Sequence, residues 1–350
     1  MHERIFKLLK SIPKKSIFYI SNPSDIFYFS GFSGTFARII AKQKRAYFIT
    51  DYRYEKVAAN LGLQKKYGLI ITKNPPKDTE ALLSGSNTVL MSRKTTIDEY
   101  FFIKKTVKNV EFSELAGEQR MIKDEEEIRL IKESVRISEK GIGHMLDIIK
   151  EGISEKDLAT ELEYFAKKQG AQDMSFPPII AFGRNSNSPH HITSSKKLKK
   201  GDIILMDMGV KYRGYCSDLT RIIAFGIIEP HLKEVKKSYN PVKEAKKISV
   251  DLYRIGVFIN KAEEKARGFL AKHGLERYFT HSLGHSLGID IHEPPSCSLK
   301  EKGVFKKGMV LTCEPGIYLK DYGIRIEDDY LVTENGPEKL GKMKDDLIIM

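Results

Sequence analysis

The chain has 350 residues, of which 41% are hydrophobic and 10% aromatic. This composition is ordinary for a globular protein with a sizeable core, and the length fits two domains or one large one. No run approaches the roughly 18 apolar residues that a transmembrane helix needs, so no membrane partner is expected. The formal net charge of +13 would suit a nucleic-acid partner. However, the basic clusters are interrupted and no zinc-finger spacing or RNP-type aromatic motif is present, so we expect a Lys-rich surface and no nucleic-acid binding.

The cysteines and the first residues both bear on the cellular compartment. Cys216, Cys297 and Cys313 form no C-x-x-C pair, and their odd number argues against a disulfide framework. The opening segment MHERIFKLLKSIPKK lacks the apolar core and small-residue cleavage site of a signal peptide. We therefore expect a cytoplasmic protein in which the three cysteines are buried as small hydrophobic residues.

Residues 1–117 alternate short apolar runs with helix-like segments, which predicts a small α/β domain with its own core. The dipeptide Asn22-Pro23 predicts a turn. The predicted strands of this part are Ile17–Ile20, Ala37–Ala41, Ala46–Thr50, Gly68–Thr72 and Thr88–Met91.

Residues 118–350 begin with helices. Apolar residues at spacings of three, four and seven predict an amphipathic helix over Asp124–Lys150, with Asp124 and Glu127 as a capping box. Another helix is predicted from Ser154, with Asp157 three residues on. Two more helices are predicted near Leu232–Tyr253 and Asn260–His273.

Strands dominate the rest of this part. Asp202–Gly209 and Cys216–Phe225 flank the turn Val210–Gly214, which predicts a hairpin. Met309–Glu314 and Gly323–Thr333 are later predicted strands. Helices on one side of a curved, largely antiparallel sheet would make this an α+β domain.

Two aspartates interrupt the apolar sequence of the predicted hairpin. Asp207 lies in ILMDMG and Asp218 in YCSDLTRII. Burying an unpaired carboxylate in a strand is costly, and binding a metal ion would remove that cost. The hairpin would bring the two carboxylates within reach of one ion, although either residue alone could face solvent.

Histidines and further acids follow. The segment HSLGHSLGIDIHEPP places His281, His285 and His292 within 12 residues, which favours a functional cluster over three separate core histidines. Glu314 ends a predicted strand in LTCEPGIY, and Glu327 interrupts the apolar strand GIRIEDDYLVT. Glu327 also begins a run of three acids, which is typical of a solvated edge. In a strand, residues two apart point to the same face. Glu327 is the residue of the run that lies two positions after Arg325.

Taken together, these residues resemble the five metal ligands of the prolidase, aminopeptidase P and methionine aminopeptidase group. The order D-x10-D, H, E-P-G and E matches that group, as does the G-H-x-x-G context. The resemblance implies a pita-bread catalytic domain over residues 118–350. It extends more weakly into residues 1–117, where PSDIFYFSGFSG and ITDYRY resemble the creatinase-like N-terminal domain of the creatinase/prolidase branch. The implied ligands are Asp207, Asp218, His285, Glu314 and Glu327.

The resemblance implies a dinuclear centre, in which four carboxylates balance the charge of two divalent ions. One imidazole among oxygen ligands favours Mn²⁺, Co²⁺, Fe²⁺ or Zn²⁺ over Ca²⁺ or Mg²⁺, with Mn²⁺ or Co²⁺ expected first. By the family pattern, Asp218 and Glu327 would bridge the ions. Asp207 would complete one site, while His285 and Glu314 would complete the other. Glu314 would also carry the proton of the attacking water to the leaving nitrogen.

Other histidines match the surroundings of the family's site. His190, in NSPHH, matches a histidine that lines the substrate site, whereas His191 matches no recurrent family histidine and is interpreted as a loop residue. His281 resembles a residue that flanks the prolyl pocket, and we include it among the catalytic candidates. His292, in HEPP, resembles the histidine that contacts the substrate carbonyl and steadies the tetrahedral intermediate.

Two more residues complete the implied substrate site. Arg325 resembles the family arginine near the substrate's carboxylate end and near Glu327. Tyr318, four residues after Glu314, matches a family tyrosine close to the site. Simple packing or an ion pair would also explain either residue.

The front domain narrows the implied activity. Methionine aminopeptidases generally lack such a domain, so its presence points to the Xaa-Pro branch. The compact length resembles the shorter prolidases, which cleave Xaa-Pro dipeptides. The alternative is aminopeptidase P, which removes the residue before proline from longer peptides. A non-catalytic pita-bread binding module would suit the basic charge but not the intact ligand set. We expect a short proline-containing peptide as substrate and, by analogy, a homodimer.

Overall fold

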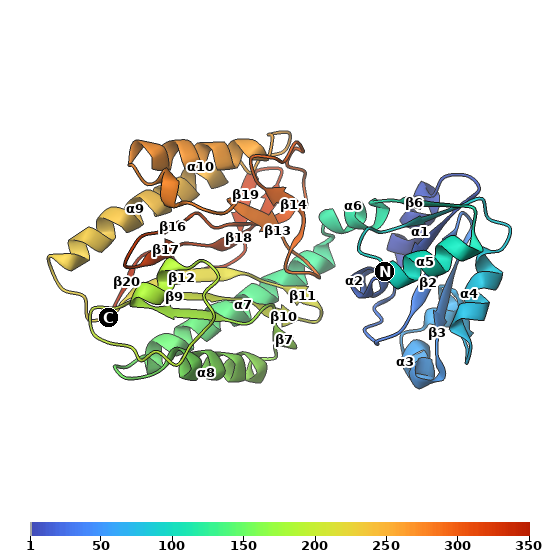
Figure 1. The fold of residues 1–350 in the computed structure, drawn as a ribbon, viewed down its shortest axis with the longest axis horizontal. Helices are drawn as coiled ribbons and strands as arrows, with labels where there is room; N and C mark the ends of the chain where they lie inside the picture. The colour runs from blue at the N-terminus through green and yellow to red at the C-terminus, as the bar shows by residue number, and fades with distance from the viewer. Residues whose placement is uncertain (1) are drawn as a thin grey trace. The chain divides into compact units, whose positions relative to one another are not determined.

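The computed structural model describes residues 2–350, which form one compact unit ending at Arg120 and a second beginning at Met121 (Figure 1). The domain boundary predicted after residue 117 falls within helix α6 (Leu115–Met121) and remains a prediction. Among the described residues, no helix is long and apolar enough to cross a membrane.

The first unit is built on a six-stranded mixed sheet in the order β4-β3-β2-β1-β5-β6. All five predicted strands are present, and the sheet adds the short β6, which the sequence analysis did not predict. The strands are β1 (Ser16–Ile20), β2 (Arg38–Lys42), β3 (Arg45–Thr50), β4 (Gly68–Ile71), β5 (Thr88–Met91) and β6 (Asn109–Phe112). The helices are α1 (His2–Ser11), α2 (Pro23–Ser30), α3 (Glu55–Asn60), α4 (Pro75–Leu83), α5 (Ile97–Thr106) and α6.

The turn predicted at Asn22-Pro23 is wrong, because these residues begin helix α2. The Asn22 side chain accepts hydrogen bonds from the backbone N–H groups of Ser24 and Asp25, at 3.0 and 3.2 Å. Pro23 occupies the first helical position, where its missing N–H leaves no hydrogen bond unmade. The same two residue types that mark turns therefore form a helix N-cap here.

The second unit carries four long helices close to the predicted positions. They are α7 (Glu125–Ile148), α8 (Glu155–Lys168), α9 (His231–Val250) and α10 (Asn260–Lys272). Asp124 and Glu127 form the predicted capping box of α7. Ser154 and Asp157 form the same motif at the start of α8. In each box the side chains satisfy backbone N–H groups that the first helical turn leaves free.

The strands of the second unit form several small sheets, in the orders β11-β10-β7, β20-β12-β9-β8, β14-β13-β15-β18-β19 and β16-β17. Their pairing is antiparallel apart from β12 with β20. The strands are β7 (Asp173–Met174), β8 (Ile179–Phe182), β9 (Ile203–Met208), β10 (Val210–Tyr212), β11 (Tyr215–Cys216), β12 (Leu219–Ala224), β13 (Gly284–Ser286), β14 (Glu293–Cys297), β15 (Val310–Cys313), β16 (Gly316–Tyr318), β17 (Gly323–Arg325), β18 (Asp328–Thr333), β19 (Gly336–Lys339) and β20 (Ile348–Ile349).

Three details of this unit differ from the sequence analysis. Val210–Tyr212 form strand β10, so the predicted five-residue turn narrows to Arg213 and Gly214, both with positive φ. The predicted strand Gly323–Thr333 divides into β17 and β18 at Ile326 and Glu327. Helices cover two sides of the strands: α7 and α8 contact β10 and β8, whereas α9 and α10 contact β15 and β14 (Figure 1).

The core of the second unit lies between these strands and helices and includes two of the three cysteines, Cys297 and Cys313. All three cysteines are free and buried, as predicted. Burial raises the pKa of the Cys216 thiol to about 11 and that of Cys297 to about 12. These side chains therefore pack as small hydrophobic groups at neutral pH.

Candidate metal centre and active site

The five predicted metal ligands come from separate segments of the second unit and line one cavity of about 730 Å³. Asp207 lies near the end of β9, directly opposite Thr220 of β12, and Asp218 immediately precedes β12. The other three come from later strands and their ends. They are His285 in β13, Glu314 directly after β15, and Glu327 between β17 and β18.

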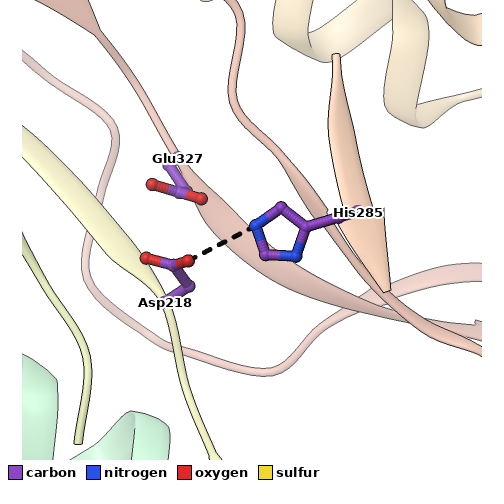
Figure 2. Close-up of side chains that lie close together, drawn as sticks. All are labelled: Asp218, His285 and Glu327. Atoms are coloured by element: carbon purple, nitrogen blue, oxygen red, sulfur yellow. Dashed lines mark ion pairs between the residues drawn. The ribbon is translucent and has the colours of Figure 1, made fainter. Parts of the chain in front are cut away.

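Three of these side chains form the tightest group. Asp218, His285 and Glu327 each offer one ligand atom, and these atoms lie within 4.8 Å of one another. Figure 2 shows the Asp218 carboxylate facing the His285 ring, with 3.5 Å between Oδ2 and Nε2, and the Glu327 carboxylate beside them. Glu314 joins the group, because its Oε1 lies 3.5 Å from the same Nε2. The fold thus brings together four of the five residues that the sequence predicts as ligands of one centre.

Several carboxylates of the cavity are buried without enough hydrogen bonds to compensate for the loss of water. Asp207 Oδ1, Asp218 Oδ1 and Glu327 Oε1 are inaccessible to solvent and have no hydrogen-bond partner among the described residues. Burial and the negative charge of its neighbours, Glu327 foremost, raise the pKa of Asp218 well above its ordinary value. Burial likewise raises the pKa of Glu314 to about 8. A cluster of buried acids with unused oxygens fits the binding of cations, which would supply the missing charge and bonds.

The tautomer of His285 also fits a metal ligand. Its Nδ1 lies 3.1 Å from the Ser286 carbonyl oxygen, which can only accept a hydrogen bond. Nδ1 therefore carries the proton, and the lone pair of Nε2 points at the carboxylates of Asp218 and Glu314. Burial lowers the pKa of the ring to about 4, so the ring is neutral at physiological pH. A neutral imidazole with a directed lone pair is the form that binds metal.

Arg325 organises one wall of the cavity. Its Nε donates to the Thr220 hydroxyl at 3.1 Å, and its Nη1 donates to the Pro189 carbonyl at 3.2 Å and to the Tyr318 hydroxyl at 2.6 Å. Its Nη2 donates to the carboxylate of Asp207. The guanidinium thus donates four hydrogen bonds to the protein and fixes Asp207 and Tyr318. A contact between Arg325 and the substrate carboxylate remains a prediction.

His281 continues this network. Because the Tyr318 hydroxyl accepts from Arg325, its own proton is directed at His281 Nε2, 2.9 Å away. His281 Nδ1 therefore carries the ring proton and donates to the Ser282 carbonyl at 2.8 Å. Burial lowers the pKa of this ring to about 3. A neutral ring with both nitrogens engaged favours the pocket-shaping role predicted for His281 over the catalytic one.

The remaining predicted histidines line the same cavity. His190 lies in the loop after β8, and His292 lies just before β14 with its ring centroid 4.3 Å from that of His285. Burial lowers the pKa of His292, so its ring is neutral at physiological pH. Apolar side chains that include Phe176 and Ile291 form another part of the lining. The cavity therefore combines an acidic centre, neutral imidazoles and an apolar wall.

Hydroxyl groups behind the ligands were missed by the sequence analysis. Thr220 Oγ1 donates to Glu327 Oε2 at 2.6 Å, and Thr312 Oγ1 donates to Glu314 Oε1 at 3.2 Å. Both threonines are fully buried. Thr220 lies two residues after Asp218, and Thr312 lies two residues before Glu314. In a strand, residues two apart point to the same face, so this spacing could have indicated that the hydroxyls lie beside the ligands. Each hydroxyl fixes one oxygen of a glutamate, and the other oxygen of Glu327 has no hydrogen-bond partner among the described residues.

The prediction of a solvated edge at the acidic run is wrong for Asp328 and Asp329, which are both 0% exposed. Asp328 accepts from Arg221 Nη2 at 2.6 Å and pairs with the buried Lys246. Burial opposes ionisation of Asp328, but these cations overcome it and hold its pKa below the ordinary value. Arg221 Nη1 also donates to the Glu327 carbonyl at 2.7 Å. A buried ion network therefore fixes the backbone that carries the predicted ligand.

Asp329 supports the centre from the same side. Its Oδ2 accepts from the backbone N–H of Asp218 at 3.0 Å. This hydrogen bond fixes the chain where it enters β12 and presents the Asp218 carboxylate to the cavity. Two of the three acids in the run thus act behind the ligands, where sequence periodicity gave no indication of them.

Comparisons with known proteins assign both units to families. The pattern of metallopeptidase family M24 matches residues 129–334, and that of the creatinase/prolidase N-terminal domain matches residues 4–122. An Xaa-Pro dipeptidase of Pyrococcus furiosus is 35% identical over 99% of this chain and 100% of its own length. The structure of an Xaa-Pro dipeptidase from Bacillus anthracis aligns with a TM-score of 0.94 at 32% identity, covering 100% of both chains. That of an X-Pro aminopeptidase from Thermotoga maritima aligns with a TM-score of 0.87 at 30% identity, covering 96% of this chain and 97% of its own.

These matches cover both units, and they agree with the resemblance drawn from the ligand motifs and with the two-domain fold predicted from it. Members of family M24 are metallopeptidases, which implies divalent metal ions in the acidic cavity. The chain therefore belongs to metallopeptidase family M24, as an enzyme of the prolidase and aminopeptidase P group with a creatinase-type N-terminal domain.

Proposed function

We propose that the protein is an Xaa-Pro dipeptidase, a prolidase, that hydrolyses the bond before proline in dipeptides with two divalent metal ions. The buried cluster of acids around His285 supports metal-dependent hydrolysis. Similarity over nearly the whole chain to the Xaa-Pro dipeptidase of Pyrococcus furiosus is the observation that carries the choice of substrate. The cavity volume of about 730 Å³ also lies in the range of small-molecule sites.

Asp207, Asp218, His285, Glu314 and Glu327 would hold the ions in this proposal. Four carboxylates match the charge of two divalent cations, and a single imidazole among oxygens favours Mn²⁺ or Co²⁺, with Zn²⁺ or Fe²⁺ as alternatives. When bound, such ions supply a water of lowered pKa and polarise a peptide carbonyl. The unused oxygens of Asp207, Asp218 and Glu327 support these residues as ligands.

The side chains around the centre would divide the remaining work. Glu314, whose Oε1 is held by Thr312, would accept a proton from the attacking water and deliver it to the proline nitrogen as the peptide bond breaks. His292 would donate a hydrogen bond to the substrate carbonyl as negative charge develops on its oxygen. His190 and His281 would bound the substrate site, while Arg325 and Tyr318 keep its wall in place.

The test of this proposal compares an Xaa-Pro dipeptide with an Xaa-Pro-Yaa tripeptide after loading the purified protein with Mn²⁺ or Co²⁺. We expect metal-dependent cleavage of the dipeptide, with the higher kcat/KM, and loss of activity after chelation. Preference for the tripeptide would favour the alternative, aminopeptidase P, to which the aligned Thermotoga maritima structure corresponds. Absence of cleavage of either peptide by the metal-loaded protein would contradict both.

Replacement of His292 by alanine separates substrate contact from metal binding. We expect kcat/KM for the dipeptide to fall by roughly 10²- to 10³-fold, as on removal of a hydrogen-bond donor to a developing oxyanion. Metal content, measured by mass spectrometry, should stay at the wild-type level, because His292 is outside the tight cluster of Asp218, His285 and Glu327. Loss of metal together with activity would show that His292 acts as a ligand.

The oligomeric state and the compartment are two further parts of the proposal. We propose a homodimer, by analogy with the family. We propose the cytoplasm as the compartment, because the three cysteines are free, buried and odd in number.

A further inference from the structure

The loop between β8 and β9 carries two adjacent histidines in different environments. His190 lines the cavity, as expected for a substrate-site residue. His191 Nε2 instead lies 2.9 Å from Oε2 of Glu155, the first residue of helix α8. Because a carboxylate can only accept, His191 Nε2 carries a proton and donates it to Glu155. The interpretation of His191 as a plain loop residue is therefore incomplete.

Glu155 is fully buried and collects hydrogen bonds from both ends of this loop. Its Oε1 accepts from the backbone N–H of Phe182 and from Asn185 Nδ2, each at 2.8 Å. Its Oε2 accepts from His191 and from both the N–H and the hydroxyl of Ser194, at 2.8 and 2.6 Å. Burial opposes ionisation, but these donors overcome it and hold the pKa of Glu155 below its ordinary value. One carboxylate therefore fixes four residues of the segment 182–194.

Contacts on the opposite side join the same loop to the active-site wall. Ser186 Oγ accepts from the backbone N–H of Gly323 at 2.9 Å, and the Pro189 carbonyl accepts from Arg325 at 3.2 Å. His190 thus follows a residue held by Arg325 and precedes a residue held by Glu155. Its backbone is fixed on both sides, although its own side chain is left to face the cavity.

We propose that Glu155 and His191 are positioning residues for substrate binding, which hold the loop 182–194 so that His190 meets the bound peptide. This inference rests on the proposed Xaa-Pro dipeptidase function for its kinetic test. It assigns the adjacent histidines opposite tasks: His190 faces the substrate, and His191 anchors the loop.

The test uses Glu155→Gln and His191→Leu, with Glu161→Gln as the matched control. Glu161 lies on the same helix and pairs with His144 at 3.0 Å, but neither residue lines the cavity. Glutamine at position 155 keeps one acceptor oxygen and turns an NH₂ group toward donors, so the loop loses at least two hydrogen bonds. We expect kcat/KM for the dipeptide to fall roughly 10- to 100-fold, mainly through KM, as when a binding group is misplaced. The control should stay within about twofold.

Three comparisons separate positioning from a general loss of stability. Metal content should not change in either variant. His191→Gln, which keeps a donor near the Nε2 position, should recover most of the activity that His191→Leu loses. In a double-mutant cycle, Glu155→Gln should cost less than about twofold when His190 is already alanine, because the two residues act on the same interaction. An equal cost in both backgrounds, or no recovery with glutamine at 191, would overturn the proposal.

Hydrogen–deuterium exchange of the metal-loaded protein tests the same inference without a substrate. We expect faster exchange in residues 182–194 of Glu155→Gln and His191→Leu, and wild-type exchange there in Glu161→Gln. If wild type cleaves no Xaa-Pro dipeptide but the loop loosens in these variants, the proposed function fails while the anchoring role stands. If the loop exchanges as in wild type, the positioning role itself fails.

Discussion

Replacing Glu314 with glutamine is expected to lower kcat for an Xaa-Pro dipeptide by roughly 10²- to 10⁴-fold or more, the range for loss of a general acid–base group. The carboxamide has nearly the same shape and still accepts the hydrogen bond from Thr312. It cannot take up the proton of the attacking water, and it is a weaker ligand because it carries no charge. The effect should therefore appear in kcat even when excess metal restores occupancy.

The measurement is kcat at saturating dipeptide across a series of Mn²⁺ concentrations, with bound metal determined in parallel. Glu334→Gln provides a control, because Glu334 is an exposed partner of Lys307 outside the cavity. It should match wild type in both measurements. If Glu314→Gln holds two ions and retains turnover within tenfold of wild type, Glu314 is not the proton carrier.

Replacing Asp218 with asparagine is expected to abolish metal-dependent activity and, at the same time, to stabilise the metal-free protein. Burial and the charges of Glu327 and other neighbouring acids raise the pKa of Asp218 in the folded state. A carboxyl group with a raised folded pKa favours folding only at low pH, and its contribution turns unfavourable above the unfolded pKa of about 3.9. At neutral pH the isosteric amide removes this penalty without leaving a cavity.

The gain should be about 0.5–2 kcal/mol, the usual range for removing a functional but destabilising group. Thermal unfolding in chelator, with and without added Mn²⁺, measures both effects. Wild type should melt at a higher temperature when metal is added, because ligand binds the folded state preferentially. The variant should start higher in chelator and respond little to metal. A variant that melts below metal-free wild type would show that repulsion and burial of the acids do not destabilise the metal-free protein. A full metal response would show that Asp218 is not a ligand.

Local features of this fold could be predicted from the sequence. The capping boxes at Asp124 and Ser154 depend on residues three positions apart, so the pattern alone locates the helix starts. Asp207 and Asp218 were identifiable because each is a lone acid in an apolar stretch of the sequence. The pairing of β9 with β12 follows from their closeness in the chain. In each case the interacting residues lie close together in the sequence, so a local pattern contains both of them.

Other features could not be predicted, because they depend on partners far away in the chain. Asp328 and Asp329 were interpreted as part of a solvated edge, because a run of acids is typical of one. Asp328 is neutralised by Arg221 and Lys246, which lie 107 and 82 residues before it, together with Lys339, which lies 11 residues after it. The role of His191 likewise depends on Glu155, 36 residues earlier. Sequence periodicity does not identify which of the chain's lysines and arginines will pair with a given acid in the fold.

The three buried cysteines provide a way to detect unfolding of the second unit. Cys216, Cys297 and Cys313 all belong to the second unit, and burial keeps their thiols protonated and out of reach of reagents. A thiol-modifying probe can react with them only after that unit has locally or globally opened. The first unit contains no cysteine and therefore does not react with the same probe. The rate of labelling would therefore time the unfolding of one domain within the intact chain, without an engineered tag.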